Sequence, residues 1–207
     1  MLNYELHSPD QNDIQVNDLL FIKEAMALPQ WFVMRDLKRS NAKQPAYKLL
    51  NDLKIKCFTP MIWKTFISKG KHILKEVPFM QDLLFVYDSR RVLDPIVERI
   101  ATLQYRFVKG GKRMPMTVRT EDMDRFIKAV STMERPNFYT PEEIEPSMIG
   151  KKVRIVGGPL DGYEGYLQKI QGSKVKHLFV ELPNVLTAAV EVNPEYIQVL
   201  ELSLIHI

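Results

Sequence analysis

The stretch from Val153 to Ile170 constrains the fold of this 207-residue chain more than any other. Two short apolar runs flank a turn region, and in the first run Val153 and Ile155 alternate with charged neighbours. The turn region is rich in residues that permit or impose turn geometry: Gly157, Gly158, Pro159, Gly162 and Gly165. Glycine reaches left-handed backbone conformations without a steric penalty, and alternation with a period of two is typical of a β-strand. The pattern therefore predicts a β-hairpin.

The hairpin opens a segment, 148–201, that is rich in β-branched residues and turn signals. Strands are expected at 151–157, 164–170, 176–182 and 186–192, with a last short strand at 196–200. Short strands at this spacing predict a small all-β domain. The tail 202–207 resembles the translation of a transposon-end sequencing adaptor, so it is left out of the functional interpretation.

The segment 31–130 follows a different pattern, with strands and helices in the order β-α-β-β-α-β-α. Strands are expected at 31–34, 57–63 and 83–87 and in a hairpin around Gly110 and Gly111, and helices at 45–53, 89–100 and 120–130. The first of these helices is expected to turn Ala46, Leu49, Leu50 and Leu53 inward. Thr120 is expected to cap the last one, with Phe126, Ile127 and Val130 on its buried side. A Lys/Gly loop around Gly70 predicts a further, long hairpin. This order predicts an α+β domain, in which an antiparallel sheet carries helices on one face. Residues 1–30 form an N-terminal arm in this scheme, and the proline-rich segment 131–147 is a linker.

Aromatic residues of the first domain have two interpretations. They are either core residues or, on a sheet face that no helix covers, part of a partner site. The set comprises Trp31, Phe32, Phe58, Trp63, Phe79, Phe85 and Tyr105. The sequence leaves the choice open, because strand alternation does not say which face the helices cover.

Charge is unevenly distributed along the chain, although the net charge is only +4. Residues 1–30 hold five acids and one base, a net charge of −4, whereas residues 31–80 hold eleven bases and three acids, a net charge of +8. The basic region is either a solvated surface or a face that meets nucleic acid. Charge alone favours the solvated surface.

Catalytic and metal-binding patterns are missing from the sequence. The four histidines are scattered, Cys57 is the only cysteine, and Gly157-Gly158 lacks the Lys-Ser/Thr of a phosphate-binding loop. We therefore expect no enzyme, no metal site and no cofactor. A single cysteine, the lack of a signal-peptide pattern and the lack of a long apolar run predict a cytoplasmic protein that does not meet the membrane.

The order of several motifs resembles the N-terminal domain of the NusG family of transcription elongation factors. These motifs are Trp31-Phe-Val-Met, Cys57-Phe-Thr-Pro-Met-Ile, Val77-Pro-Phe-Met-Gln-Asp-Leu-Leu-Phe-Val86 and Tyr105-Arg-Phe-Val-Lys-Gly-Gly111. The glycine-rich hairpin resembles the KOW motif, whose turn residues are here Gly158, Pro159, Gly162 and Gly165. Thr59-Pro60-Met61-Ile62 is closer to specialised paralogues, the RfaH and UpxY antiterminators, than to housekeeping NusG. The resemblance implies an SH3-like KOW barrel for the second domain.

The resemblance also implies a non-catalytic factor that binds the β′ and β subunits of RNA polymerase and supports processive transcription. Its apolar patch corresponds to Phe79, Met80 and Leu83, although the Phe-Pro-Gly-Tyr pattern of the family is not kept. Upstream or non-template DNA is expected at the basic loop, where the candidates are Lys38, Arg39 and Lys43.

The loop from Leu182 to Leu186 lacks the aromatic and arginine residues with which housekeeping NusG meets Rho or a ribosomal protein. This departure, together with those at Met80, Gln81 and Leu83, favours a specialised paralogue. The UpxY resemblance then implies antitermination at particular operons, above all polysaccharide capsule operons. Two alternatives stay open: housekeeping NusG, and a ribosome-associated RNA-binding protein that uses a KOW domain. The target operons, the leader sequence, the oligomeric state and the role of residues 1–30 are not specified by the sequence.

Overall fold

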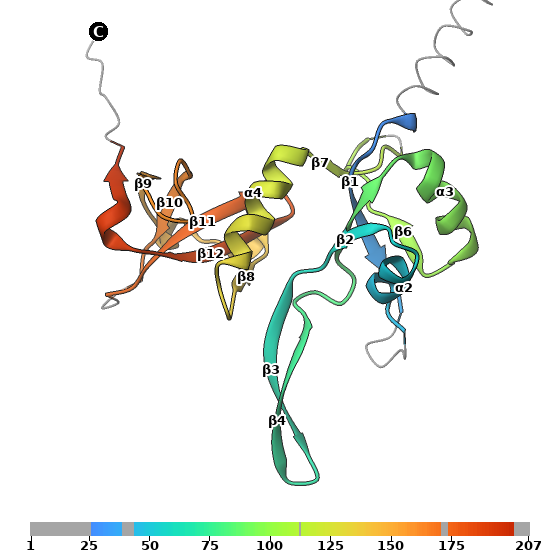
Figure 1. Cartoon of the computed structure of the whole chain (residues 1–207), viewed down its shortest axis with the longest axis horizontal. Coiled ribbons are helices and arrows are strands. Elements are labelled where there is room, and N and C mark those ends of the chain that lie inside the picture. The colour runs from blue at the N-terminus through green and yellow to red at the C-terminus, as the bar shows by residue number, and fades with distance from the viewer. Residues whose placement is uncertain (1–25, 39–43, 112, 171–173, 201–207) are drawn as a thin grey trace, which may run out of the picture.

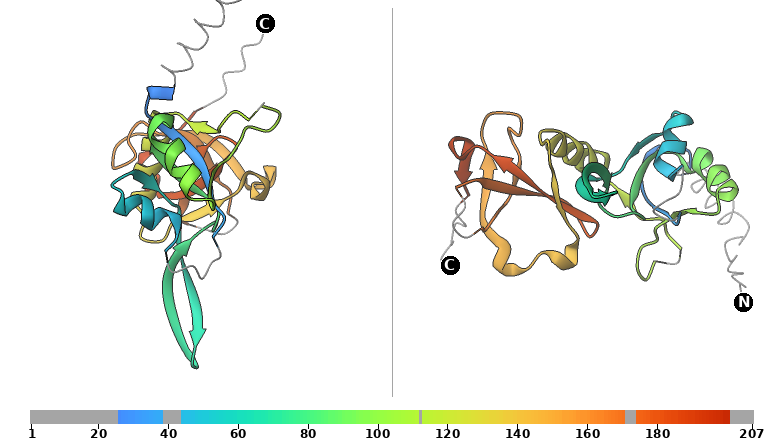
Figure 2. Two further views of the ribbon diagram at one scale, coloured as in Figure 1. Left: turned by 90° about the vertical axis from the view of Figure 1, so that its right-hand side faces the viewer. Right: turned by 90° about the horizontal axis from the view of Figure 1, so that it is seen from below.

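The computed structural model describes residues 26–38, 44–111, 113–170 and 174–200. Figure 1 shows two β-rich units side by side, with helix α4 (Thr120–Ser131) between them. A long hairpin projects from the first unit and points away from both, as Figure 2 also shows. The chain is therefore an α+β protein with two units and one extended arm.

The first unit is built on a five-stranded antiparallel sheet. Its strands are β1 (Gln30–Asp36), β2 (Lys56–Phe58), β5 (Leu84–Asp88), β6 (Leu103–Tyr105) and β7 (Thr117–Val118). The order is β2-β5-β1-β6, and β7 pairs with β1 beside this path. The central strands β1 and β5 are almost entirely buried, as expected for strands covered on both faces.

Each face of this sheet has its own hydrophobic cluster, because successive strand residues point to opposite sides. Phe32 and Met34 pack with the helices α2 (Ala46–Asp52) and α3 (Arg90–Arg99). Trp31 and Val33 lie on the other face, in a cluster that contains α4 and residues of the second unit. The prediction that helices cover one face was therefore incomplete, since α4 and the second unit cover the other.

The predicted strand 57–63 is two strands. It breaks after β2, and β3 (Met61–Ser68) then pairs with β4 (Lys71–Pro78) in a separate two-stranded sheet. Pro60 lies at the break, where it cannot donate a ladder hydrogen bond. The predicted hairpin around Gly70 is confirmed, with Lys69 at φ 51° and Gly70 at φ 73° in its turn.

Two helix details differ from the sequence patterns. Leu53 was expected to point inward from the helix at 45–53, but α2 ends at Asp52 and Leu53 is 51% exposed. The last helix was expected to take Thr120 as its cap, whereas Arg119 occupies that position and pairs with Asp122 in the first turn. The inward residues Ala46 and Leu50 are buried as predicted.

The second unit is a six-stranded antiparallel sheet in the order β13-β9-β10-β11-β12-β8. Its strands are β8 (Asn137–Tyr139), β9 (Ile149–Ile155), β10 (Glu164–Gln168), β11 (Lys176–Leu182), β12 (Leu186–Val192) and β13 (Ile197–Val199). The bounds of β11 and β12 are those predicted from the sequence. The pairings run from β13 to β8, and these two edge strands do not pair with each other in the described residues, so the sheet does not close into the barrel that the KOW resemblance implies.

The segment 131–147, expected to be a linker, supplies part of this sheet. It contains β8 and two short 3-10 helices, η1 (Pro141–Glu143) and η2 (Pro146–Met148). Thr140 and Glu143 form a reciprocal capping box that fixes the start of η1. A third 3-10 helix, η3 (Pro194–Tyr196), precedes β13. The chain that connects the units is therefore an ordered element of the second one.

Candidate functional site

The junction between the units is formed by a chain of phenylalanine rings. Phe58 lies with its ring centroid 6.2 Å from that of Phe126, and Phe126 lies 6.2 Å from Phe138. Phe79, at the base of the hairpin, lies 5.6 Å from Phe138. Phe58, Phe79 and Phe126 come from the first unit and α4, whereas Phe138 belongs to β8. Aromatic contacts at these distances stabilise a packed interface.

Helix α4 turns apolar side chains toward both sheets. Met123, Phe126 and Ala129 are fully buried and share one hydrophobic cluster with Trp31 of the first sheet and Leu186 of the second. The sequence predicted the burial of Phe126, together with that of Ile127 and Val130, which are half-buried against the same cluster. It predicted neither the burial of Met123 and Ala129 nor the two partners of the helix. The shared cluster makes the two units one packed body.

Polar contacts at the other side of α4 reinforce the junction. The hydroxyl of Tyr163 donates a hydrogen bond of 2.9 Å to the backbone carbonyl of Arg125, an exposed residue of α4. The Arg125 guanidinium lies 4.7 Å from the centre of the Tyr163 ring. Burial raises the pKa of the Tyr163 phenol, so this hydroxyl stays a donor at neutral pH.

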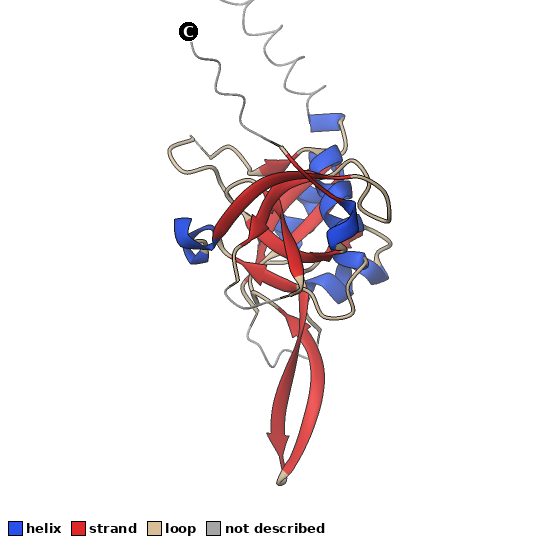
Figure 3. Ribbon diagram, turned by 90° about the vertical axis from the view of Figure 1, so that its left-hand side faces the viewer, coloured by secondary structure: helices blue, strands red, loops and turns tan. Residues whose placement is uncertain are grey.

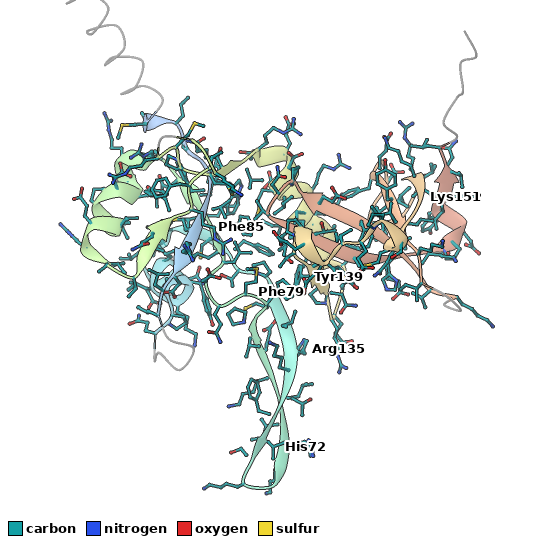
Figure 4. The ribbon with its side chains drawn as sticks, turned by 180° about the vertical axis from the view of Figure 1, so that it is seen from behind. His72, Phe79, Phe85, Arg135, Tyr139 and Lys151 are labelled. Atoms are coloured by element: carbon teal, nitrogen blue, oxygen red, sulfur yellow. The ribbon has the colours of Figure 1, made fainter. Side chains whose placement is uncertain are left out.

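The three residues predicted to bind polymerase lie at this junction. Leu83 is 1% exposed, while Phe79 and Met80 are half-buried and pack against the shared cluster. The Phe79 amide donates to the Pro60 carbonyl and the Leu83 amide to that of Met80, which holds the segment between β4 and β5 in a tight turn. Figure 4 shows Phe79 where the base of the hairpin meets the second unit. In this conformation the patch is covered.

Of the predicted nucleic-acid contacts, Lys38 is within the described residues, and Arg39 and Lys43 lie outside them. The Lys38 ammonium donates a 2.7 Å hydrogen bond to the Gln44 carbonyl. Its backbone amide donates to the buried carboxylate of Asp36, which also accepts from the Ala46 amide at the start of α2. Lys38 therefore has a part in closing the loop between β1 and α2.

The predicted KOW-turn residues shape the turn between β9 and β10 and allow β10 to pack closely on β11. Gly158 and Gly162 have φ values of 70° and 78°, a region that side chains rarely adopt, and Pro159 lies between them. A Cβ on Gly165 would lie 2.6 Å from the Phe179 carbonyl oxygen, so only glycine lets β10 approach β11 this closely. The hairpin prediction is confirmed by the pairing of β9 with β10. Its assignment as a KOW motif stays a prediction.

The loop from Leu182 to Leu186 joins β11 to β12. Leu182, Val185 and Leu186 are buried in the shared cluster, and only Pro183 and Asn184 are exposed. Asn184 takes the left-handed conformation, with φ 60°, that the turn requires. The apolar side chains of this loop therefore pack inside the protein and are not exposed to a partner.

Titratable groups give no sign of a catalytic centre among the described residues. No group of three or more His, Cys, Asp or Glu side chains is arranged there to hold a metal ion. Cys57 is partly buried, its thiol donates to the Asn51 side chain at 3.2 Å, and burial raises its pKa. A raised pKa keeps the thiol protonated and weakens it as a nucleophile.

In the part of the chain that the structure describes, no helix is long and apolar enough to span a bilayer.

Comparison with protein families gives a match in the first unit. Residues 29–127 match one family model, described as "Transcription termination factor nusG". The match supports the NusG family. It covers the first sheet, the hairpin β3–β4 and most of α4, and it ends before the second unit begins.

Other comparisons give less. No curated protein matches the chain. One solved structure, described as "Domain interaction in Thermotoga maritima NusG", aligns with a TM-score of 0.42 at 14% identity, over 85% of this chain and 99% of that one.

Two features of the site were missed by sequence reasoning. Phe138 was assigned to a linker, and the only signal for its burial was an apolar pair, Phe138-Tyr139, in a proline-rich segment. The second feature is the separation of the hairpin β3–β4 from the main sheet, which leaves its side chains exposed.

Proposed function

We propose that this protein is a non-catalytic transcription elongation factor of the NusG type that binds RNA polymerase. The observation that carries the proposal is the match of residues 29–127 to the NusG family model. The fold is compatible with this role, since the matched segment forms an α+β domain with an apolar patch and a basic hairpin. Contacts with the β′ and β subunits and with upstream DNA are part of the proposal.

The finer proposal is antitermination at particular operons, such as those for capsule polysaccharides. Two observations support it over a housekeeping role. The segment from Phe79 to Leu83 lacks the family's Phe-Pro-Gly-Tyr pattern, and the Leu182 to Leu186 loop holds its apolar side chains inside the molecule. A loop occupied in this way has little apolar surface left for Rho or a ribosomal protein.

Polymerase binding in this scheme requires the units to separate. Phe79 contacts Phe138 of the second unit in the described state, and Met80 packs against the cluster that both units share, so polymerase and the second unit compete for this patch. Polymerase must then favour the open state by at least the free energy that holds the junction together. In this proposal the described state is a closed one that does not bind polymerase.

Transcript abundance along operons after deletion of the gene tests the functional proposal. Loss of promoter-distal transcripts from one or a few operons would support the specialised role. A genome-wide change, or increased read-through at Rho-dependent sites, would identify a housekeeping NusG. Association with ribosomes in place of polymerase would identify an RNA-binding protein of the ribosome.

Co-purification with core polymerase tests the patch. Leu83→Glu is unsuitable, because a charge at a side chain 1% exposed would disturb the fold. Met80→Gln places a neutral polar group at a half-buried position and should reduce the polymerase recovered. Met114→Gln, at a methionine 58% exposed on another loop, is the matched control. Equal recovery of both variants would remove Met80 from the proposed surface.

A triple variant tests the basic loop. Replacing Lys38, Arg39 and Lys43 by alanine should weaken association with the elongation complex and reduce its salt dependence, because phosphate contacts release counterions. An unchanged salt slope would exclude these residues from the DNA contact.

A further inference from the structure

The hairpin β3–β4 stands apart from both units. Each strand has eight residues, so the ribbon is about 26 Å long at ~3.3 Å per residue. Figure 3 shows it extending beyond the rest of the protein. From Trp63 to Glu76 every residue is exposed, and the sequence 61–78 contains four lysines and one acid. A ribbon this exposed contributes little to the core.

Strand pairing assigns its side chains to two faces, since directly opposed residues lie on the same side of a sheet. One face, here called the basic face, carries the opposed pairs Lys64 and Lys75, Phe66 and Ile73, and Ser68 and Lys71. The opposite face carries Trp63 and Glu76, Thr65 and Leu74, and Ile67 and His72. The only acid of the ribbon is therefore on the opposite face.

The opposed lysines Lys64 and Lys75 are unfavourable for the hairpin itself. Like charges directly opposite each other destabilise a strand pair, and an isolated two-stranded hairpin has little stability in reserve. Among the described residues, no ion pair involves Lys64, Lys71 or Lys75. The positive charge of this face is thus available to an anion outside the molecule.

An aromatic side chain lies between the charges. Phe66 is 42% exposed, and its neighbour across the ribbon, Ile73, is 38% exposed. Along the ribbon, the lysine pair lies about 7 Å to one side of Phe66 and Lys71 about 7 Å to the other, two residues away in each direction. Positive charges on both sides of an exposed aromatic ring are the arrangement with which proteins hold single-stranded nucleic acid.

We propose that the basic face of the β3–β4 hairpin binds single-stranded nucleic acid, with a base stacked on Phe66 and flanking phosphates on Lys64, Lys75 and Lys71. A duplex fits this face less well. In a duplex the bases are stacked on one another and offer no free ring face to Phe66, so a duplex would keep only the phosphate contacts. The proposal extends the proposed function but does not depend on polymerase.

Fluorescence anisotropy with a labelled oligothymidylate and the full chain tests the proposal. The double variant Lys64→Ser/Lys75→Ser loses two phosphate contacts, so its salt slope should fall by about 1.4, at ~0.7 per contact for single strands. Its charge-matched control is Lys151→Ser/Lys152→Ser, on two exposed lysines of β9. Figure 4 shows Lys151 far from His72 of the hairpin. The control should lower the slope by less than half of this amount.

A second pair of variants separates stacking from charge. Phe66→Ser should weaken binding by roughly tenfold or more, since a stacked base contributes substantially to affinity. Ile67→Ser, at the adjacent residue on the opposite face and 73% exposed, should change binding less than twofold. Both substitutions are on the exposed ribbon, so an unchanged thermal unfolding transition would show that the body of the protein is intact.

Three results would overturn the proposal. Equal losses in the hairpin and β9 double variants would show that only general charge matters. Unchanged binding by Phe66→Ser would exclude stacking, and a duplex of the same length bound as tightly as the single strand would exclude the proposed ligand. Because the assay contains no polymerase, such results would leave the polymerase proposal standing, and loss of polymerase binding would not affect this one.

Discussion

Replacement of Phe138 by alanine should loosen the junction between the two units. Phe138 is 6% exposed and contacts the rings of Phe79 and Phe126, so its side chain is buried between β8 and the first unit. Truncation of a buried phenylalanine to alanine costs about 3–5 kcal/mol, which includes the lost burial and the cavity left behind. A loss of about 3 kcal/mol changes an equilibrium constant by roughly a hundredfold.

Urea unfolding followed by circular dichroism measures this loss. The wild-type protein should unfold in one cooperative transition, because the shared cluster couples the units. In Phe138→Ala the first transition should occur at lower urea, and the two units should unfold separately. Tyr166→Ala is the control, since Tyr166 is on β10 of the same sheet and 42% exposed. It should change the free energy of unfolding by less than about 1 kcal/mol.

Polymerase binding gives a second readout of the same variant. If the second unit covers Phe79 and Met80, a weaker junction should increase the affinity for core polymerase, whereas Tyr166→Ala should leave it unchanged. A Phe138→Ala protein that loses less than about 1 kcal/mol and keeps one transition would refute the shared core. A destabilised variant with unchanged polymerase affinity would refute the competition between polymerase and the second unit.

Three further substitutions or reactions test individual contacts. Tyr163→Phe removes the hydrogen bond to the Arg125 carbonyl and should lower the free energy of unfolding by about 0.5–1.5 kcal/mol in urea titrations. Gly165→Ala places a Cβ 2.6 Å from a backbone oxygen of β11 and should destabilise the second unit more than Gly162→Ala, where only φ 78° opposes a side chain; equal losses in the same titrations would contradict this. Cys57 should react with iodoacetamide more slowly than glutathione at pH 8, since burial raises its pKa and lowers its thiolate fraction, and an equal rate would contradict the partial burial.

Local patterns in the sequence determined the elements that depend on neighbouring residues. The alternation in 176–192 predicted the bounds of β11 and β12, and the glycines from Gly157 to Gly165 predicted the hairpin β9–β10. The apolar spacing around Phe126 predicted the burial of this residue on α4. The order of these elements also carried the NusG resemblance, which the match of residues 29–127 supports.

Tertiary structure decided which apolar surfaces meet. The rings of Phe79 and Phe138 are 59 positions apart by number (138 − 79), and no local pattern records that they are in contact. Tertiary packing also explains why a strand, β8, forms in a proline-rich segment: the edge of β12 offers backbone hydrogen bonds that a short strand can satisfy. Periodicity tells which side of an element is apolar, but only the assembled fold decides what covers it. For this reason the sequence could indicate the candidate polymerase-binding residues, but it could not predict that they are buried at the junction.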